Sequence, residues 1–109
     1  MDFEKIKDDA LAYEKSLIEE YRSSILPENV SYFVSLEDCY GRELNDDFKW
    51  LYDACDRKNP AKVLELCKKY EQSAHDYAAD WFDEDLGIVR SGYAFEAEVY
   101  RKLSDICKC

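Results

Sequence analysis

The sequence predicts an all-α protein, a single domain of four main helices over residues 1–109 with a short extra helical turn in the segment 28–44. Three observations predict this class. Apolar residues recur at alternating intervals of three and four along several stretches, which is the spacing of one face of an α-helix. Residues that start and stop helices separate these stretches. With 47% apolar residues, the chain can build one modest core without a metal or a disulfide.

The first helix is expected from Phe3 to Ser24. Mixed charges cover the sides that do not face the core, as on a solvated helix surface. Asp2 is a suitable N-cap. Leu26-Pro27 ends the helix, because the residue before a proline is disfavoured in the helical conformation. The apolar stripe consists of Phe3, Ile6, Ala10, Tyr13, Leu17 and Tyr21.

The segment 28–44 allows two interpretations. Residues 31–35, SYFVS, have the composition of a strand, but a single short strand with no second strand to pair with is marginal in water. The interpretation we favour is a short helix capped by Ser35, with Asp38 three residues later and Gly41 as its stop.

A further helix is expected to begin at Asn45, as its N-cap, and to end near Lys58. Asp46 and Asp47 would then occupy its first turn, where negative charge suits the helix dipole. Trp50 lies off its apolar face. That face consists of Phe48, Leu51, Tyr52 and Cys55.

The helix predicted from Asn59 to Trp81 has the clearest start in the chain. Asn59 is a good N-cap, and Pro60 stands at the first helical position, where its missing N–H costs nothing. A last helix is expected from Gly92 to Cys107, with a wide apolar arc. The stripe of the helix 59–81 consists of Val63, Cys67, Tyr70, Ala74, Tyr77 and Trp81.

The composition is strongly acidic. Asp and Glu number 25 against 15 Lys and Arg, a formal net charge of -10. This charge is repelled by phosphate backbones and by anionic membranes, so neither nucleic acid nor a membrane is an expected direct partner. A basic protein surface is the partner that such a charge attracts.

The cysteines and the amino terminus bear on location. The five cysteines are odd in number and include no C-x-x-C pair, which favours free thiols and a reducing compartment. The first residues, MDFEKIKDDA, contain no apolar secretory segment, and no run approaches the ~20 apolar residues of a membrane span. We therefore expect a cytoplasmic protein.

No stretch carries a catalytic, cofactor or metal signature. The three glycines form no phosphate-binding loop. His75 has no nucleophile that the sequence places beside it, and it is expected to pair with Glu71 one turn earlier. Calcium loops started at Asp80 or at Asp83 lack the required glycine and glutamate at their sixth and twelfth positions. We expect no enzyme, no cofactor and no metal.

The strongest local oddity is the acidic end of the helix 59–81. Carboxylates near a helix C-terminus oppose the helix dipole by roughly 0.3–1 kcal/mol each, and locally broken rules mark places to look for function. One interpretation is a binding site for a partner's basic side chains or a divalent cation. In the other, the helix ends at Trp81 or Phe82 and Asp83 caps the next helix. The residues concerned are Asp76, Asp80, Asp83, Glu84 and Asp85.

We therefore hypothesise a non-catalytic, acidic helical binding protein. Its most concrete form is an inhibitor or decoy that mimics nucleic acid and occupies the basic groove of a nucleic-acid enzyme, as phage anti-restriction or anti-CRISPR proteins do. Carboxylates at i and i+4 on a helix lie ~5–6 Å apart, the order of spacing of charges along a nucleic-acid strand. The partner-binding residues would be Asp76, Asp80, Trp81, Phe82, Asp83, Glu84 and Asp85, with Asp46, Asp47 and Asp53.

Two alternatives stay open. The first is an immunity or adaptor protein, in which exposed aromatic side chains supply the affinity and charge mainly steers the encounter. The second is a structural homo-oligomer. A phosphate mimic should lose much of its affinity at high salt, whereas an aromatic-anchored adaptor should lose little. The aromatic candidates are Tyr32, Phe33, Trp50, Trp81 and Phe82.

Overall fold

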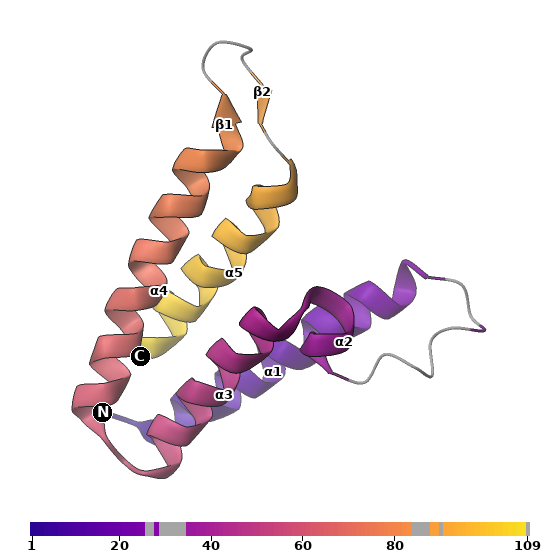
Figure 1. The fold of residues 1–109 in the computed structure, drawn as a ribbon. Helices are drawn as coiled ribbons and strands as arrows, with labels where there is room; N and C mark the ends of the chain where they lie inside the picture. The colour runs from indigo at the N-terminus through magenta and orange to yellow at the C-terminus, as the bar shows by residue number, and fades with distance from the viewer. Residues whose placement is uncertain (26–27, 29–34, 84–87, 90, 109) are drawn as a thin grey trace. The chain divides into compact units, whose positions relative to one another are not determined.

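The computed structural model describes the backbone of residues 1–25, 28, 35–83, 88–89 and 91–108, and the side chains of these residues outside 79–94. The described helices are α1 (Phe3–Ser23), α2 (Leu36–Tyr40), α3 (Arg42–Asp56), α4 (Pro60–Trp81) and α5 (Ser91–Cys107) (Figure 1). The predicted all-α class, with four main helices and a short extra helical turn, is confirmed.

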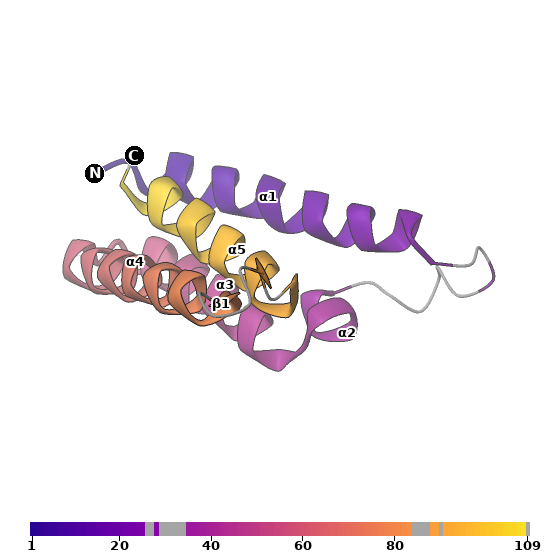
Figure 2. The same cartoon turned by 90° about the horizontal axis from the view of Figure 1, so that it is seen from above.

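Contacts between Cα atoms divide the chain into two compact units. The first unit, Met1–Asn59, contains α1, α2 and α3, and α1 and α2 both pack against α3. In the second unit, Pro60–Cys109, α4 and α5 lie side by side (Figures 1 and 2). The expectation of a single domain over 1–109 stays a prediction.

Helix α1 begins as the sequence predicts. The Asp2 side chain accepts a hydrogen bond from the Lys5 backbone N–H at 3.0 Å, which satisfies one of the donors left open at a helix start. Ile6, Ala10 and Leu17 of the predicted stripe are buried. The helix ends at Ser23, one residue before the predicted end.

Helix α2 confirms the interpretation favoured for the segment 28–44. Ser35 and Asp38 form a reciprocal capping box, in which each side chain accepts from the backbone N–H of the other residue. Gly41 ends the helix with φ +102°, a left-handed conformation that glycine adopts without steric cost. Residues 31–34, for which a strand was the alternative, lie outside the described residues.

The predicted start of α3 is wrong. The helix begins at Arg42, directly after Gly41, so Asn45 lies inside it and is not its N-cap. Asn45 and Asp47 are both buried, and Asp47 therefore does not belong to an exposed first turn. Local cap preference favoured Asn45, but the side chains that α3 buries against α1 and α2 decide where the helix starts. The buried apolar residues of α3 are Leu44, Phe48, Leu51, Ala54 and Cys55.

Helix α4 begins at Pro60, as predicted, and its apolar stripe packs against α5. Tyr70 is 0% exposed, and its ring stacks on Tyr100 of α5 at a centroid distance of 6.1 Å. The ring of Tyr77 stacks on the same Tyr100 at 5.6 Å. Helix α5 begins one residue before its predicted start.

Two short strands between α4 and α5 were not predicted. β1 (Phe82–Asp83) pairs with β2 (Ile88–Val89) in an antiparallel ladder. Helix α4 ends at Trp81, as one interpretation of the acidic segment proposed. The cap that this interpretation assigned to Asp83 is wrong, because Asp83 belongs to β1 and the next described helix begins at Ser91.

A half-buried carboxylate lies at the contact between α1 and α3. Burial raises the pKa of Glu14, and the Tyr52 hydroxyl and the Lys49 ammonium beside it on α3 partly offset this effect. The Tyr52 hydroxyl is itself buried and makes no hydrogen bond of good geometry with a described residue. Burial and the neighbouring Glu14 raise the pKa of Tyr52, so its hydroxyl stays neutral.

Replacement of Tyr70 by Ala should destabilise the protein by about 3–5 kcal/mol, because it removes a fully buried ring and leaves a cavity. Chemical denaturation measures this free energy of unfolding. Leu64→Ala is the matched control on the same helix: Leu64 is 53% exposed, and its loss should change stability by no more than about 0.5 kcal/mol. If the two substitutions lower the free energy of unfolding equally, Tyr70 does not belong to the core of the second unit and the prediction is wrong.

Replacement of Glu14 by Gln should stabilise the protein at pH 7. The pKa of Glu14 is higher in the folded chain than its ordinary 4.5, so the folded chain binds more protons over an interval that starts near 4.5 and extends upward. Stability therefore falls as the pH rises through this interval, so part or all of the penalty of the buried charge is present at pH 7.

Thermal unfolding of the Glu14→Gln variant at several pH values measures this effect. The gain in Tm should be present at pH 7 and should vanish as the pH falls below the ordinary pKa of 4.5. Glu20→Gln, at an exposed position of the same helix, is the control and should show no such gain. If Glu14→Gln is less stable than the parent at pH 7, the charged carboxylate holds the contact together and the prediction is wrong.

Candidate protein-binding site

The carboxylates that the sequence nominated for partner binding lie on different elements. Asp46, Asp47 and Asp53 belong to α3 of the first unit, and Asp76 belongs to α4 of the second. The remaining candidates have side chains outside the described residues. These are Asp80, Trp81, Phe82, Asp83, Glu84 and Asp85.

Two of the three nominated carboxylates on α3 are either buried or already paired within the chain. Asp47 is 1% exposed, so its side chain does not lie on the surface of this structure as the nomination expected. With its start at Asn45, the predicted helix placed Asp47 in an exposed first turn. Because α3 begins at Arg42, Asp47 instead lies in the second turn, where it is buried. The Asp53 carboxylate accepts a hydrogen bond from the Arg57 guanidinium at 3.1 Å, so the chain itself partly neutralises it.

The outward side of α3 carries one continuous stripe that includes Trp50. Its members follow at intervals of three and four residues, which places them on one side of the helix. Trp50, at the centre, is 48% exposed, although tryptophan is on average a highly buried residue. We call this set the Trp50 stripe; it consists of Glu43, Asp46, Trp50, Asp53 and Arg57.

The charges of the Trp50 stripe are arranged unevenly. Asp53 and Arg57 pair with each other at one end. At the other end, neither Glu43 nor Asp46 takes part in an ion pair with another residue that the structure describes. The indole therefore lies between an acidic end and a neutralised end. Sequence reasoning missed Glu43; its spacing of seven residues from Trp50 was the signal that could have found it.

Asp76 lies on an exposed side of α4, where its carboxylate accepts a hydrogen bond from the Gln72 amide at 2.8 Å. Glu71, one turn before His75, was expected to pair with that histidine. Instead the Glu71 carboxylate pairs with the Lys108 ammonium of α5 at 3.6 Å. Both partners are exposed, so this ion pair contributes little to stability.

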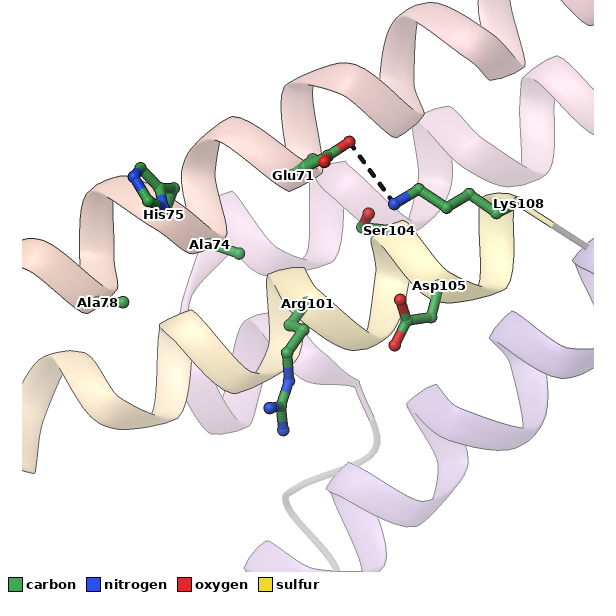
Figure 3. Close-up of a pocket in the computed structure, with 8 residues that line it drawn as sticks. All are labelled: Glu71, Ala74, His75, Ala78, Arg101, Ser104, Asp105 and Lys108. Carbon is green, nitrogen blue, oxygen red and sulfur yellow. Dashed lines mark ion pairs between the residues drawn. The ribbon is translucent and has the colours of Figure 1, made fainter.

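A shallow pocket between α4 and α5 is lined by polar and charged side chains from both helices (Figure 3). Figure 3 shows Glu71 and Lys108 reaching toward each other, whereas the His75 and Arg101 side chains point in different directions. Acyl or phosphoryl transfer requires a nucleophile, a base and an oxyanion donor that converge on one point. The His75 and Arg101 side chains do not converge in this way. The pocket is lined by Glu71, Ala74, His75, Ala78, Arg101, Ser104, Asp105 and Lys108.

The described residues contain neither a metal-binding cluster nor a membrane-spanning helix. Within the described part of the chain, no group of three or more His, Cys, Asp or Glu side chains is arranged to hold a metal ion. None of the described helices combines the length and the apolar character that crossing a membrane requires.

Comparison of the chain with models of protein families, with curated proteins and with solved structures found no match.

Proposed function

We propose that this protein acts without catalysis, by binding another protein whose contact surface is basic, and that Trp50 anchors the complex. The observation that supports this proposal is the half-exposed indole at the centre of the Trp50 stripe. Tryptophan is enriched among the residues that dominate binding energy, because it buries a large rigid area and keeps an N–H donor.

The charges around Trp50 support the basic character of the partner. Glu43 and Asp46 stand in the first turns of α3, where the helix dipole already favours carboxylates, so their presence alone has a structural explanation. Beside an exposed indole they also give a partner's Lys or Arg side chains a place to pair. The first unit strengthens this attraction, since residues 1–59 contain 15 Asp and Glu against 8 Lys and Arg.

This proposal takes the aromatic-anchored adaptor in preference to the nucleic-acid mimic. A mimic needs several carboxylates on one face without cations of the protein's own between them. On α3, Asp47 is buried and Asp53 is paired with Arg57. The unpaired carboxylates that remain on this helix are too few to imitate a row of phosphates. The mimic hypothesis therefore rests on the segment from Asp76 to Asp85, and the variants below separate the two surfaces.

Replacement of Trp50 by Ala should weaken partner binding by at least tenfold, which corresponds to about 1.4 kcal/mol. The partner is first isolated by pull-down at two salt concentrations and identified by mass spectrometry. Its affinity is then measured for each purified variant. Thermal stability should stay within about 0.5 kcal/mol of the parent, since the indole is half-exposed. Leu64→Ala removes a similarly exposed apolar side chain from α4 and is the matched control.

Charge reversal at two places separates the hypotheses. The double variant Glu43→Lys and Asp46→Lys should slow association several-fold, and added salt should mask the effect. The triple reversal of Asp80, Asp83 and Glu84 should leave affinity nearly unchanged. If the triple variant loses binding while Trp50→Ala keeps it, and if affinity collapses with salt, the protein is a nucleic-acid mimic and the proposal is wrong.

A further inference from the structure

Two of the five cysteines are buried between α4 and α5, and the proposed function uses neither. Cys67 of α4 is 6% exposed and Cys107 of α5 is 2% exposed, and both are in the reduced, thiol form. They lie on the faces by which the two helices pack, in line with Tyr70 on α4 and with Tyr100 and Leu103 on α5. Two thiols on facing helices are the arrangement from which a covalent link between the helices can form.

The contacts between the helices place Cys67 at the level of the last turn of α5. Tyr70 stacks on Tyr100, and one turn earlier in α4 the Cys67 thiol donates to the Ser104 carbonyl oxygen at 3.6 Å. A helical carbonyl points along the axis toward the amide four residues later, so this oxygen lies against the turn that contains residues 107 and 108. Cys107 is thus the thiol of α5 that lies next to this contact.

Facing positions of closely packed helices meet the distance that a disulfide needs. Axes of packed helices lie about 8–10 Å apart, and Cα atoms lie about 2.3 Å from each axis. Cα atoms that face each other across the contact are therefore about 3.4–5.4 Å apart, which overlaps the range of about 4.4–6.8 Å found in disulfides.

We propose that Cys67 and Cys107 form a reversible disulfide when the protein meets a peroxide, and that this bond joins α4 to α5. Cys107 reacts first, because it lies in the last turn of its helix, where local opening costs less than in the middle of α4. Its thiolate attacks one peroxide oxygen, which gives a sulfenic acid and releases the other oxygen as water. The Cys67 thiol then attacks the oxidised sulfur and displaces a second water.

The bond changes the second unit in a defined way. It closes a loop that contains most of α4, both short strands and α5, and so reduces the freedom of the unfolded chain. The oxidised protein should unfold at a higher temperature than the reduced protein, and a dithiol reductant should reverse the shift. The Trp50 stripe lies in the first unit, so partner binding should not need the bond.

The test is a peptide map of the full-length protein, folded and treated with one equivalent of hydrogen peroxide. Trypsin cuts after Lys62, Lys68, Lys102 and Lys108, so Cys67 falls in the peptide 63–68, Cys107 in the peptide 103–108, and Cys109 is released separately. The expected result is a linked pair of these two peptides in monomeric protein, which dithiothreitol separates, with a loss of two titratable thiols per chain.

Single cysteine variants show which two thiols form the link. Cys67→Ala and Cys107→Ala should each abolish the linked pair and the rise in Tm, whereas Cys39→Ser should keep both. If the parent protein yields links to Cys109, Cys39 or Cys55 instead, only intermolecular links, or over-oxidised sulfinic acid without any link, the proposal is overturned. Unchanged thiols in folded protein after peroxide treatment would overturn it as well.

Discussion

Each long helix of this chain depends on burying one apolar stripe against a neighbour. Helices of 15 to 22 residues with many charges are marginal in water by themselves, so tertiary packing supplies most of their stability. Helix α1 packs against α3, and α4 packs against α5. The ring of Tyr100, on which both Tyr70 and Tyr77 stack, shows how closely the second pair meets. Residues outside these stripes can therefore cap helix ends, form ion pairs or contact a partner.

The sequence predicted those parts of the fold that local chemistry decides. The Ser35 and Asp38 capping box, the Asp2 cap and the start of α4 at Pro60 each depend on a few neighbouring residues, and all are confirmed. The start of α3 depends instead on which side chains α1 and α2 cover, and local preference for Asn45 gave the wrong answer. The two-residue strands are too short for any periodic pattern to reveal them.

The candidate site was predictable only in part, for the same reason. The position of Trp50 off the apolar face followed from helical spacing alone and is confirmed by its exposure. Whether a carboxylate is open to a partner depends on the cations that folding brings near it. Asp53 and Arg57 could be matched by their spacing, but the ion pair between Glu71 and Lys108 joins residues that are distant in sequence. Counting charges could not show which of the 25 acidic residues stay available.

The corner at Gly41 has a stereochemical consequence. This one residue ends α2 and begins α3, and its φ of +102° and ψ of 168° are close to the mirror image of ordinary extended backbone. No atom stands within 4 Å of the place where a Cβ would be, so the demand for glycine comes from torsion and not from space. A residue of inverted chirality would fit this corner without strain, whereas any ordinary amino acid would have to open it.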